Sequence, residues 1–168
     1  MELCRLTVRC SEPGHRAPVA IHASRGRVAE LESRRSMPHL ISFTTKKFDA
    51  TKVTPNPINP IAGESVLAWI RSELSKTGWD VSEPDAEDWG WYMIAARSST
   101  SYLVGASGEV EDDTPPSDWI VQIHKQRTFI QKLTGKNKMT DSDTLSDEIE
   151  ALVRRSEEFE NVDIEKSA

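Results

Sequence analysis

Six side chains that could bind an anion lie within fifteen residues of an acidic chain: His124, Lys125, Arg127, Lys132, Lys136 and Lys138. Lysine and arginine supply charge and hydrogen-bond donors for a phosphate or carboxylate, and histidine supplies a proton that titrates near neutral pH. This pattern predicts a site for an anionic ligand or an acidic partner. The preferred interpretation is nevertheless that these are solvated side chains on a short amphipathic helix and its exit loop, which balance the acidic segment 109–118.

Two adjacent acids, Glu87 and Asp88, form a second candidate site. Paired carboxylates can perform acid/base chemistry or bind a metal when they are held together. Adjacent residues of an extended chain point to opposite sides, so such a site needs a partner from elsewhere, such as Glu64 or His124. A solvated turn before a strand is the simpler interpretation and the preferred one.

The tryptophans that follow, Trp89 and Trp91, belong to the stretch EDWGWY. Their spacing places both on one face of a strand with Met93 and Ala95, while Tyr92 lies on the other face. Core packing is the simplest interpretation, and an exposed aromatic recognition patch is the alternative.

No recognisable catalytic set accompanies these residues. The segment GKNK lacks the pattern of a phosphate-binding loop, and residues 37–168 contain no cysteine nucleophile. Serines are plentiful, but none lies in a nucleophile-elbow pattern, so a Ser–His–Asp arrangement stays open. The spacings of Cys4, Cys10, His15 and His22 do not match a zinc site. We therefore expect no metal and no cofactor, and whether the chain is an enzyme stays undecided, with a protein that is not an enzyme as the preferred interpretation.

The first 36 residues differ in composition from the rest. They contain seven arginines, no lysine and four glutamates, a net charge of 7 − 4 = +3, against 14 − 23 = −9 from Met37 onward. We expect 1–36 to be a disordered or loosely attached extension, or a stretch upstream of a natural start at Met37. A transit peptide is the alternative, although the glutamates weaken it.

The elements that would position the candidate site follow from residue periodicity. Alternation predicts strands, a 3.6-residue period predicts a helix ended by Gly78, and RSSTS predicts a hairpin connection. The expected strands are 40–48, 79–81, 89–97, 101–106 and 118–123, and the expected helix is 62–77. The hairpin is apolar on both faces and should lie centrally in its sheet. The fold class predicted is α+β, an antiparallel sheet of about four to five strands with two main helices on one face.

Helices are expected again after the last strand. The sequence KQRTFIQKLTG predicts a short helix with Phe129, Ile130 and Leu133 packed and Gly135 as its end. Thr140 with Asp143 forms a capping-box signature for a second helix. That helix carries an apolar stripe, namely Leu145, Ile149, Leu152 and Val153. A single domain is thus expected over 37–156, and the charged residues 157–168 should fray.

A resemblance adds to this interpretation. The block from NPINPIAGESVLAWI through EDWGWY, YLVGAS and WIVQIHKQR to LTGKNKM resembles small bacterial proteins that are conserved but uncharacterised, over about residues 40–140. The resemblance implies no activity and transfers no catalytic residue. The acidic, tryptophan-bearing α+β character is also similar to toxin-neutralising immunity proteins, as an analogy of class.

Charge and hydropathy limit the partners and the location. A net charge of −6 argues against nucleic acid, and the chain has no apolar run long enough to span a membrane and no secretory signal. We therefore expect a cytoplasmic protein without a membrane partner. The leading hypothesis is a non-catalytic binding or regulatory module for a protein partner. The alternative is an enzyme or sensor for a small phosphorylated or carboxylated ligand that uses the His124–Lys138 segment.

Overall fold

The structure is a computed structural model that describes residues 38–48, 56–58, 60–109 and 118–166. The chain divides into two units, Met1–Arg35 and Ser36–Ala168, and every described residue belongs to the second. The expectations for residues 1–36 lie outside the described residues, as does most of the acidic segment 109–118.

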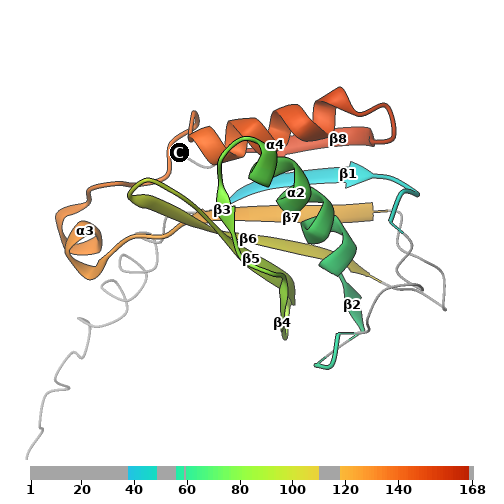
Figure 1. The fold of residues 1–168 in the computed structure, drawn as a ribbon, viewed down its shortest axis with the longest axis horizontal. Coiled ribbons are helices and arrows are strands. Elements are labelled where there is room, and N and C mark those ends of the chain that lie inside the picture. The colour runs from blue at the N-terminus through green and yellow to red at the C-terminus, as the bar shows by residue number, and fades with distance from the viewer. Residues whose placement is uncertain (1–37, 49–55, 59, 110–117, 167–168) are drawn as a thin grey trace, which may run out of the picture. The chain divides into compact units, whose positions relative to one another are not determined.

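The fold is α+β, as predicted, with helices packed on an antiparallel sheet (Figure 1). The strand order is β3-β5-β6-β7-β1-β8, and β2 and β4 pair with β6 and β5. The sheet has eight strands rather than four to five, because β2, β4 and β8 join the five that alternation predicted. The elements are β1 (His39–Thr44), β2 (Ile61–Ala62), α2 (Glu64–Lys76), β3 (Asp80–Val81), β4 (Asp85–Glu87), β5 (Gly90–Arg97), β6 (Thr100–Glu109), β7 (Asp118–Lys125), α3 (Phe129–Thr134), α4 (Thr144–Arg155) and β8 (Glu160–Glu165).

The hairpin of β5 and β6 is central, as predicted. The two strands pair from Trp91 opposite Ala106 to Arg97 opposite Thr100, and β6 pairs on its other side with β7. Between them is a two-residue turn in which Ser98 adopts a φ of 58°. The inward residues of β5 are Trp91, Met93 and Ala95, and all three are buried.

Both main helices cover this inward face (Figure 1). In α2 the buried stripe is Val66, Leu67, Ile70 and Leu74, and Gly78 ends the helix region with a φ of 86°, as expected. In α4 the predicted stripe also forms, with Leu145, Ile149 and Val153 buried and Leu152 partly buried against the core. None of the described helices is long and apolar enough to cross a membrane.

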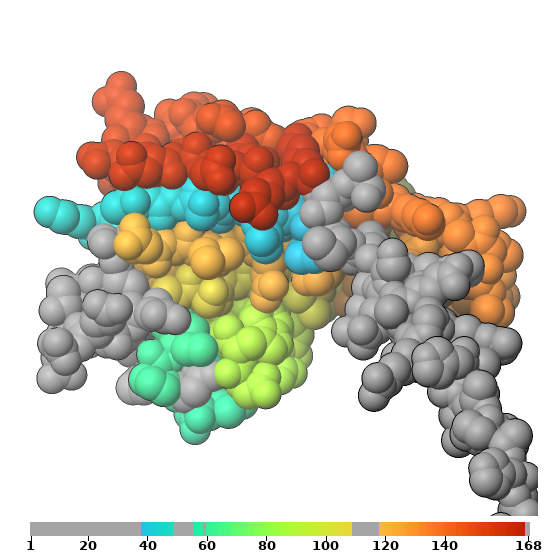
Figure 2. Space-filling model, turned by 180° about the vertical axis from the view of Figure 1, so that it is seen from behind, coloured from blue at the N-terminus to red at the C-terminus, as the bar shows by residue number. Residues whose placement is uncertain are grey.

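The opposite face of the sheet carries several side chains of intermediate burial. Strand alternation directs Ile94, Leu103, Gln122 and His124 to this outer face, because their neighbours along each strand are buried in the core. Seen from behind, segments of β1 and β7 lie at the surface (Figure 2). Among the described residues, both main helices lie on the inward face, so the outer face presents a mixed polar and apolar surface.

Two predictions for the carboxyl-terminal part are wrong. The segment 157–168 does not simply fray, because Glu160–Glu165 pairs antiparallel with β1 and places Ile164 opposite Ile41. The segment has few apolar residues, so its own sequence does not predict a strand. It becomes the edge strand β8 because it pairs with β1. In addition, α4 begins at Thr144 with Asp143 as its N-cap, so Thr140 is not the cap.

The expected packing of α3 is also wrong. The helix forms over Phe129–Thr134, with a capping box from Thr128 and a left-handed Gly135 at its end. Its apolar residues Phe129, Ile130 and Leu133 are nevertheless exposed by 75%, 71% and 72%. Periodicity identified the helix correctly, but α3 lies apart from α2 and α4, so neither helix covers it (Figure 1).

Candidate functional site

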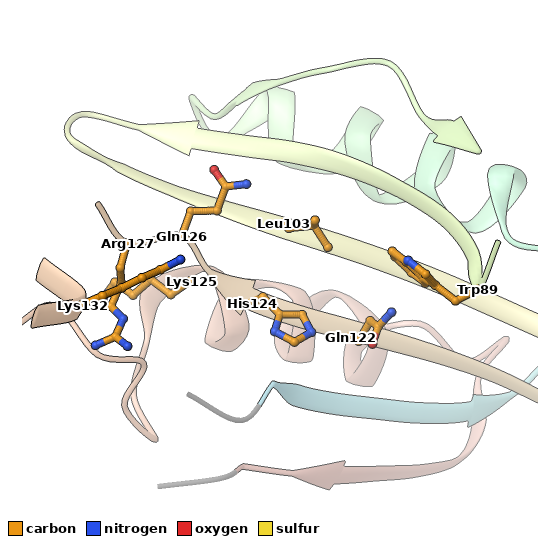
Figure 3. A pocket seen from close by; sticks show the side chains of 8 residues that line it. All are labelled: Trp89, Leu103, Gln122, His124, Lys125, Gln126, Arg127 and Lys132. Carbon is orange, nitrogen blue, oxygen red and sulfur yellow. The ribbon is translucent and has the colours of Figure 1, made fainter. Parts of the chain in front are cut away.

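An open depression of about 680 Å³ lies on the outer face of the sheet, toward the end of β7 (Figure 3). Alternation along β7 places Gln122 and His124 at its floor, and the pairing of β6 with β7 sets Leu103 opposite His124. The volume lies in the range of small-molecule sites. The lining residues are Trp89, Leu103, Gln122, His124, Lys125, Gln126, Arg127 and Lys132.

Trp89 forms one end of the depression, and Gly105 makes room for its ring. A Cβ built at Gly105 would lie only 2.6 Å from Cζ3 and 2.7 Å from Cη2 of Trp89. The prediction that Trp89 shares a face with Trp91 is therefore wrong. Trp89 lies in the turn between β4 and β5, and Gly90 follows with a φ of 143°, so the alternation of β5 begins only after this turn.

His124 presents its imidazole to the depression without a hydrogen-bond partner in the described part of the chain. Burial lowers the pKa of His124 below its usual value, so the ring is neutral at neutral pH. A neutral imidazole has one donor and one acceptor nitrogen. His124 can therefore hydrogen-bond a ligand without first losing a partner among the described residues.

Arg127 and Lys132 bring positive charge to the other end of the depression (Figure 3). Within the described residues neither forms an ion pair, and Nη1 of Arg127 is buried without a hydrogen-bond partner. Buried polar groups are normally satisfied, and burial of an unpaired charge is costly. Arg127 is only partly buried, so an incoming carboxylate or phosphate can contact the part of its side chain that faces solvent.

Lys125 also lines the depression, but its charge is already paired. Its Nζ donates to Oδ1 of Asp143 at 2.6 Å, and the Tyr102 hydroxyl donates to the same oxygen at 2.7 Å. The Thr140 amide donates to Oδ2 at 2.6 Å. Burial raises the pKa of the Asp143 carboxyl, but these hydrogen bonds outweigh it and hold that pKa below its usual value. This cluster fixes the end of β7 against the start of α4.

The predicted site residues separate into two groups. The structure brings together His124, Lys125, Arg127, Lys132 and Trp89. The others do not line the depression. Trp91 is a core residue whose Nε1 donates to the Ile61 carbonyl at 3.2 Å, Glu87 ends β4, Asp88 lies in the next turn, and Lys136 and Lys138 follow α3.

Sequence reasoning missed Leu103, Gln122 and Gln126 as lining residues. A signal for Gln122 existed, because the inward assignment of Trp119, Val121 and Ile123 already implied that Gln122 and His124 face outward together. Leu103 joins them through strand pairing, which a single sequence does not reveal.

The only Ser–His pair with a hydrogen bond in the described part of the chain is buried elsewhere. Nδ1 of His39 lies 2.8 Å from Oγ of Ser146, and both residues have an exposed fraction of 0%. Burial lowers the pKa of His39. A nucleophile needs access to its substrate, so we assign this pair to packing between β1 and α4. Among the described residues no three His, Cys, Asp or Glu side chains cluster as metal ligands.

Comparisons of the chain with protein-family models, with curated proteins and with solved structures give no match. The resemblance to conserved bacterial proteins therefore stays a prediction.

Proposed function

We propose that the protein is a non-catalytic binding module that takes an anionic group, a carboxylate or a phosphate, into the depression on the outer face of the sheet. The observation that carries this proposal is that Arg127 and Lys132 lie at the depression without an ion-pair partner among the described residues. Guanidinium and ammonium groups bind carboxylates and phosphates through charge-assisted hydrogen bonds.

The remaining walls favour a ligand that also has a flat apolar part. Trp89 and Leu103 offer an aromatic ring and an aliphatic side chain. Leu103 and His124 lie in the middle of the depression, with Trp89 and Gln122 toward one end and the cations toward the other (Figure 3). Apolar walls with a few polar groups are typical of ligand sites. A ligand with a ring that contacts Trp89 and a phosphate or carboxylate that contacts the cations matches this arrangement.

The lining composition supports binding rather than turnover. Its residues include no carboxylate, hydroxyl or thiol, so His124 is the only group there that titrates near neutral pH. A lone imidazole lacks the second group that orients it in acyl-transfer sites. The enzyme alternative therefore has less support than the binding module.

The anionic group could come from a free small molecule or from an acidic side chain of a protein partner. The predicted similarity to toxin-neutralising immunity proteins would favour the protein partner. Both sources share the same chemistry at Arg127, and titration with a small phosphate and with a glutamate-rich peptide distinguishes them.

Replacing Arg127 by Gln is expected to weaken the binding of phenyl phosphate by about tenfold or more, because one charge-assisted contact is lost. Isothermal titration calorimetry at neutral pH measures the affinity. Inorganic phosphate should bind the wild type more weakly than phenyl phosphate, since it cannot contact Trp89.

The matched control is Arg154→Gln, which removes an arginine that is 53% exposed on α4 and pairs with Glu150. Its affinity should equal that of the wild type. Equal binding by Arg127→Gln and the wild type would contradict the proposal. Release of phenol from phenyl phosphate would establish the enzyme alternative instead.

A further inference from the structure

Helix α3 presents three large apolar side chains to solvent. Phe129, Ile130 and Leu133, here termed the α3 apolar triad, are exposed by 75%, 71% and 72%. At about 100° per residue their positions fall on one side of the helix, and Lys132 flanks that side. The helix is nevertheless well formed, because Thr128 caps its start and Gly135 its end. A structured element that exposes a contiguous apolar surface marks an interaction site.

The surroundings of the triad are exclusively basic in sequence. Residues 119–140 contain five lysines and arginines and no aspartate or glutamate, in a chain of net charge −6. Lys125 is paired with Asp143, whereas Arg127, Lys132, Lys136 and Lys138 have no ion-pair partner in the described part of the chain. The charge complement of this region is therefore an anionic surface.

We propose that the α3 apolar triad and the surrounding lysines rest on an anionic lipid surface. An interfacial helix lies in the plane of the membrane surface with its apolar face buried about 5–10 Å, and the triad gives α3 such a face. Insertion of the triad and attraction of the lysines to lipid phosphates together supply the two signals that stable membrane association requires.

A lipid surface fits this element better than a protein groove. Helix-in-groove binding uses anchors at i, i+3 or i+4 and i+7, and α3 is too short to supply the last. A typical protein interface also buries about 800 Å² per partner, which calls for many more residues than three. The expectation of no membrane partner rested on the lack of a spanning segment, and contact at the interface needs none.

This proposal can be tested separately from the anion site on the outer face. Lys132 belongs to both surfaces, but the triad, Lys136 and Lys138 do not line the depression, so variants at these positions leave its lining unchanged.

The experiment measures co-sedimentation of the full chain with vesicles of phosphatidylcholine alone or mixed with equal parts of phosphatidylglycerol. The wild type should bind the mixed vesicles, and added salt should weaken binding. Serine at all three triad positions should reduce the partition coefficient by about tenfold or more. Lys136→Gln with Lys138→Gln should reduce it by about fivefold for each charge removed.

The matched controls remove exposed apolar and basic groups elsewhere: Ile58→Ser, which alters a side chain 56% exposed, and Lys46→Gln. Neither should change vesicle binding. If the triple variant does not fold, Ile130→Ser alone gives the same comparison with a smaller loss. Absence of wild-type binding, or equal binding by the triad variant, would overturn the proposal. So would a wild-type dimer in analytical ultracentrifugation that the triad variant converts to monomer, since a second copy would then cover α3.

Discussion

Replacing Asp143 by Ala is expected to lower the free energy of unfolding by about 3–5 kcal/mol, as is typical when one partner of a buried ion pair is removed. The side chain of Lys125 is only 12% exposed, and Tyr102 is 3% exposed. Without Asp143 the Lys125 ammonium and the Tyr102 hydroxyl lose their acceptor while both remain in the protein interior. Urea denaturation followed by tryptophan fluorescence measures the loss.

Two further variants isolate the cause. Asp141→Ala removes a neighbouring exposed acid and should be nearly neutral. Adding Lys125→Met to Asp143→Ala removes the unpaired charge, so it should restore part of the stability. A single Asp143 variant as stable as the wild type would show that the cluster does not hold β7 against α4.

The second large effect is expected at Gly63, the N-cap of α2. A Cβ built there would lie 2.3 Å from the carbonyl oxygen of Ala106 and 3.2 Å from Cδ1 of Trp91. The oxygen belongs to the backbone of the central strand β6, which is paired on both sides and cannot yield. Gly63→Ala should therefore cost about 2–3 kcal/mol of unfolding free energy, the upper range for overpacking.

Gly78→Ala is the matched control for this prediction. A Cβ at Gly78 meets nothing within 4 Å, but its φ of 86° is a left-handed conformation. Alanine there should cost about 1 kcal/mol through backbone strain alone. Thermal and urea unfolding of the two variants provide the comparison. If Gly63→Ala lowers the free energy of unfolding no more than Gly78→Ala does, the close approach of α2 to β6 is refuted.

The parts of the fold that follow a local period could be predicted from the sequence. Alternation identified the β5–β6 hairpin and the buried residues of β7, and the 3.6-residue period identified α2 and most of α4. These elements bury one apolar stripe each, so the pattern and the packing agree.

The predictions that are wrong concern residues whose structure depends on contacts with distant parts of the chain. The acidic segment Glu160–Glu165 becomes a strand because β1 offers it an edge. The α3 apolar triad stays exposed because amphipathicity predicts a helix and not what covers it. Trp89 lies on the outer face rather than on the predicted inward face, because the turn residues before Gly90 do not continue the alternation of β5.

The candidate site shows the same division. Its cations and His124 stand out as residue types, and Gln122 follows from alternation along β7. The meeting of Trp89 with Gly105 depends on the register of three paired strands and on the absence of a side chain at Gly105. No local pattern encodes that contact.

The most direct test of the central claim uses the indole N–H signals of the five tryptophans in ¹H–¹⁵N NMR spectra. Trp89 lines the depression, whereas the indoles of Trp79 and Trp91 donate to Glu148 and to the Ile61 carbonyl, and Trp119 is 1% exposed. The spectrum of Trp89→Phe assigns the relevant signal. If the depression binds a ring-bearing anion, phenyl phosphate should shift the Trp89 indole signal and leave those of Trp79, Trp91 and Trp119 in place. A Trp89 signal that stays unchanged at saturating phenyl phosphate would contradict the account.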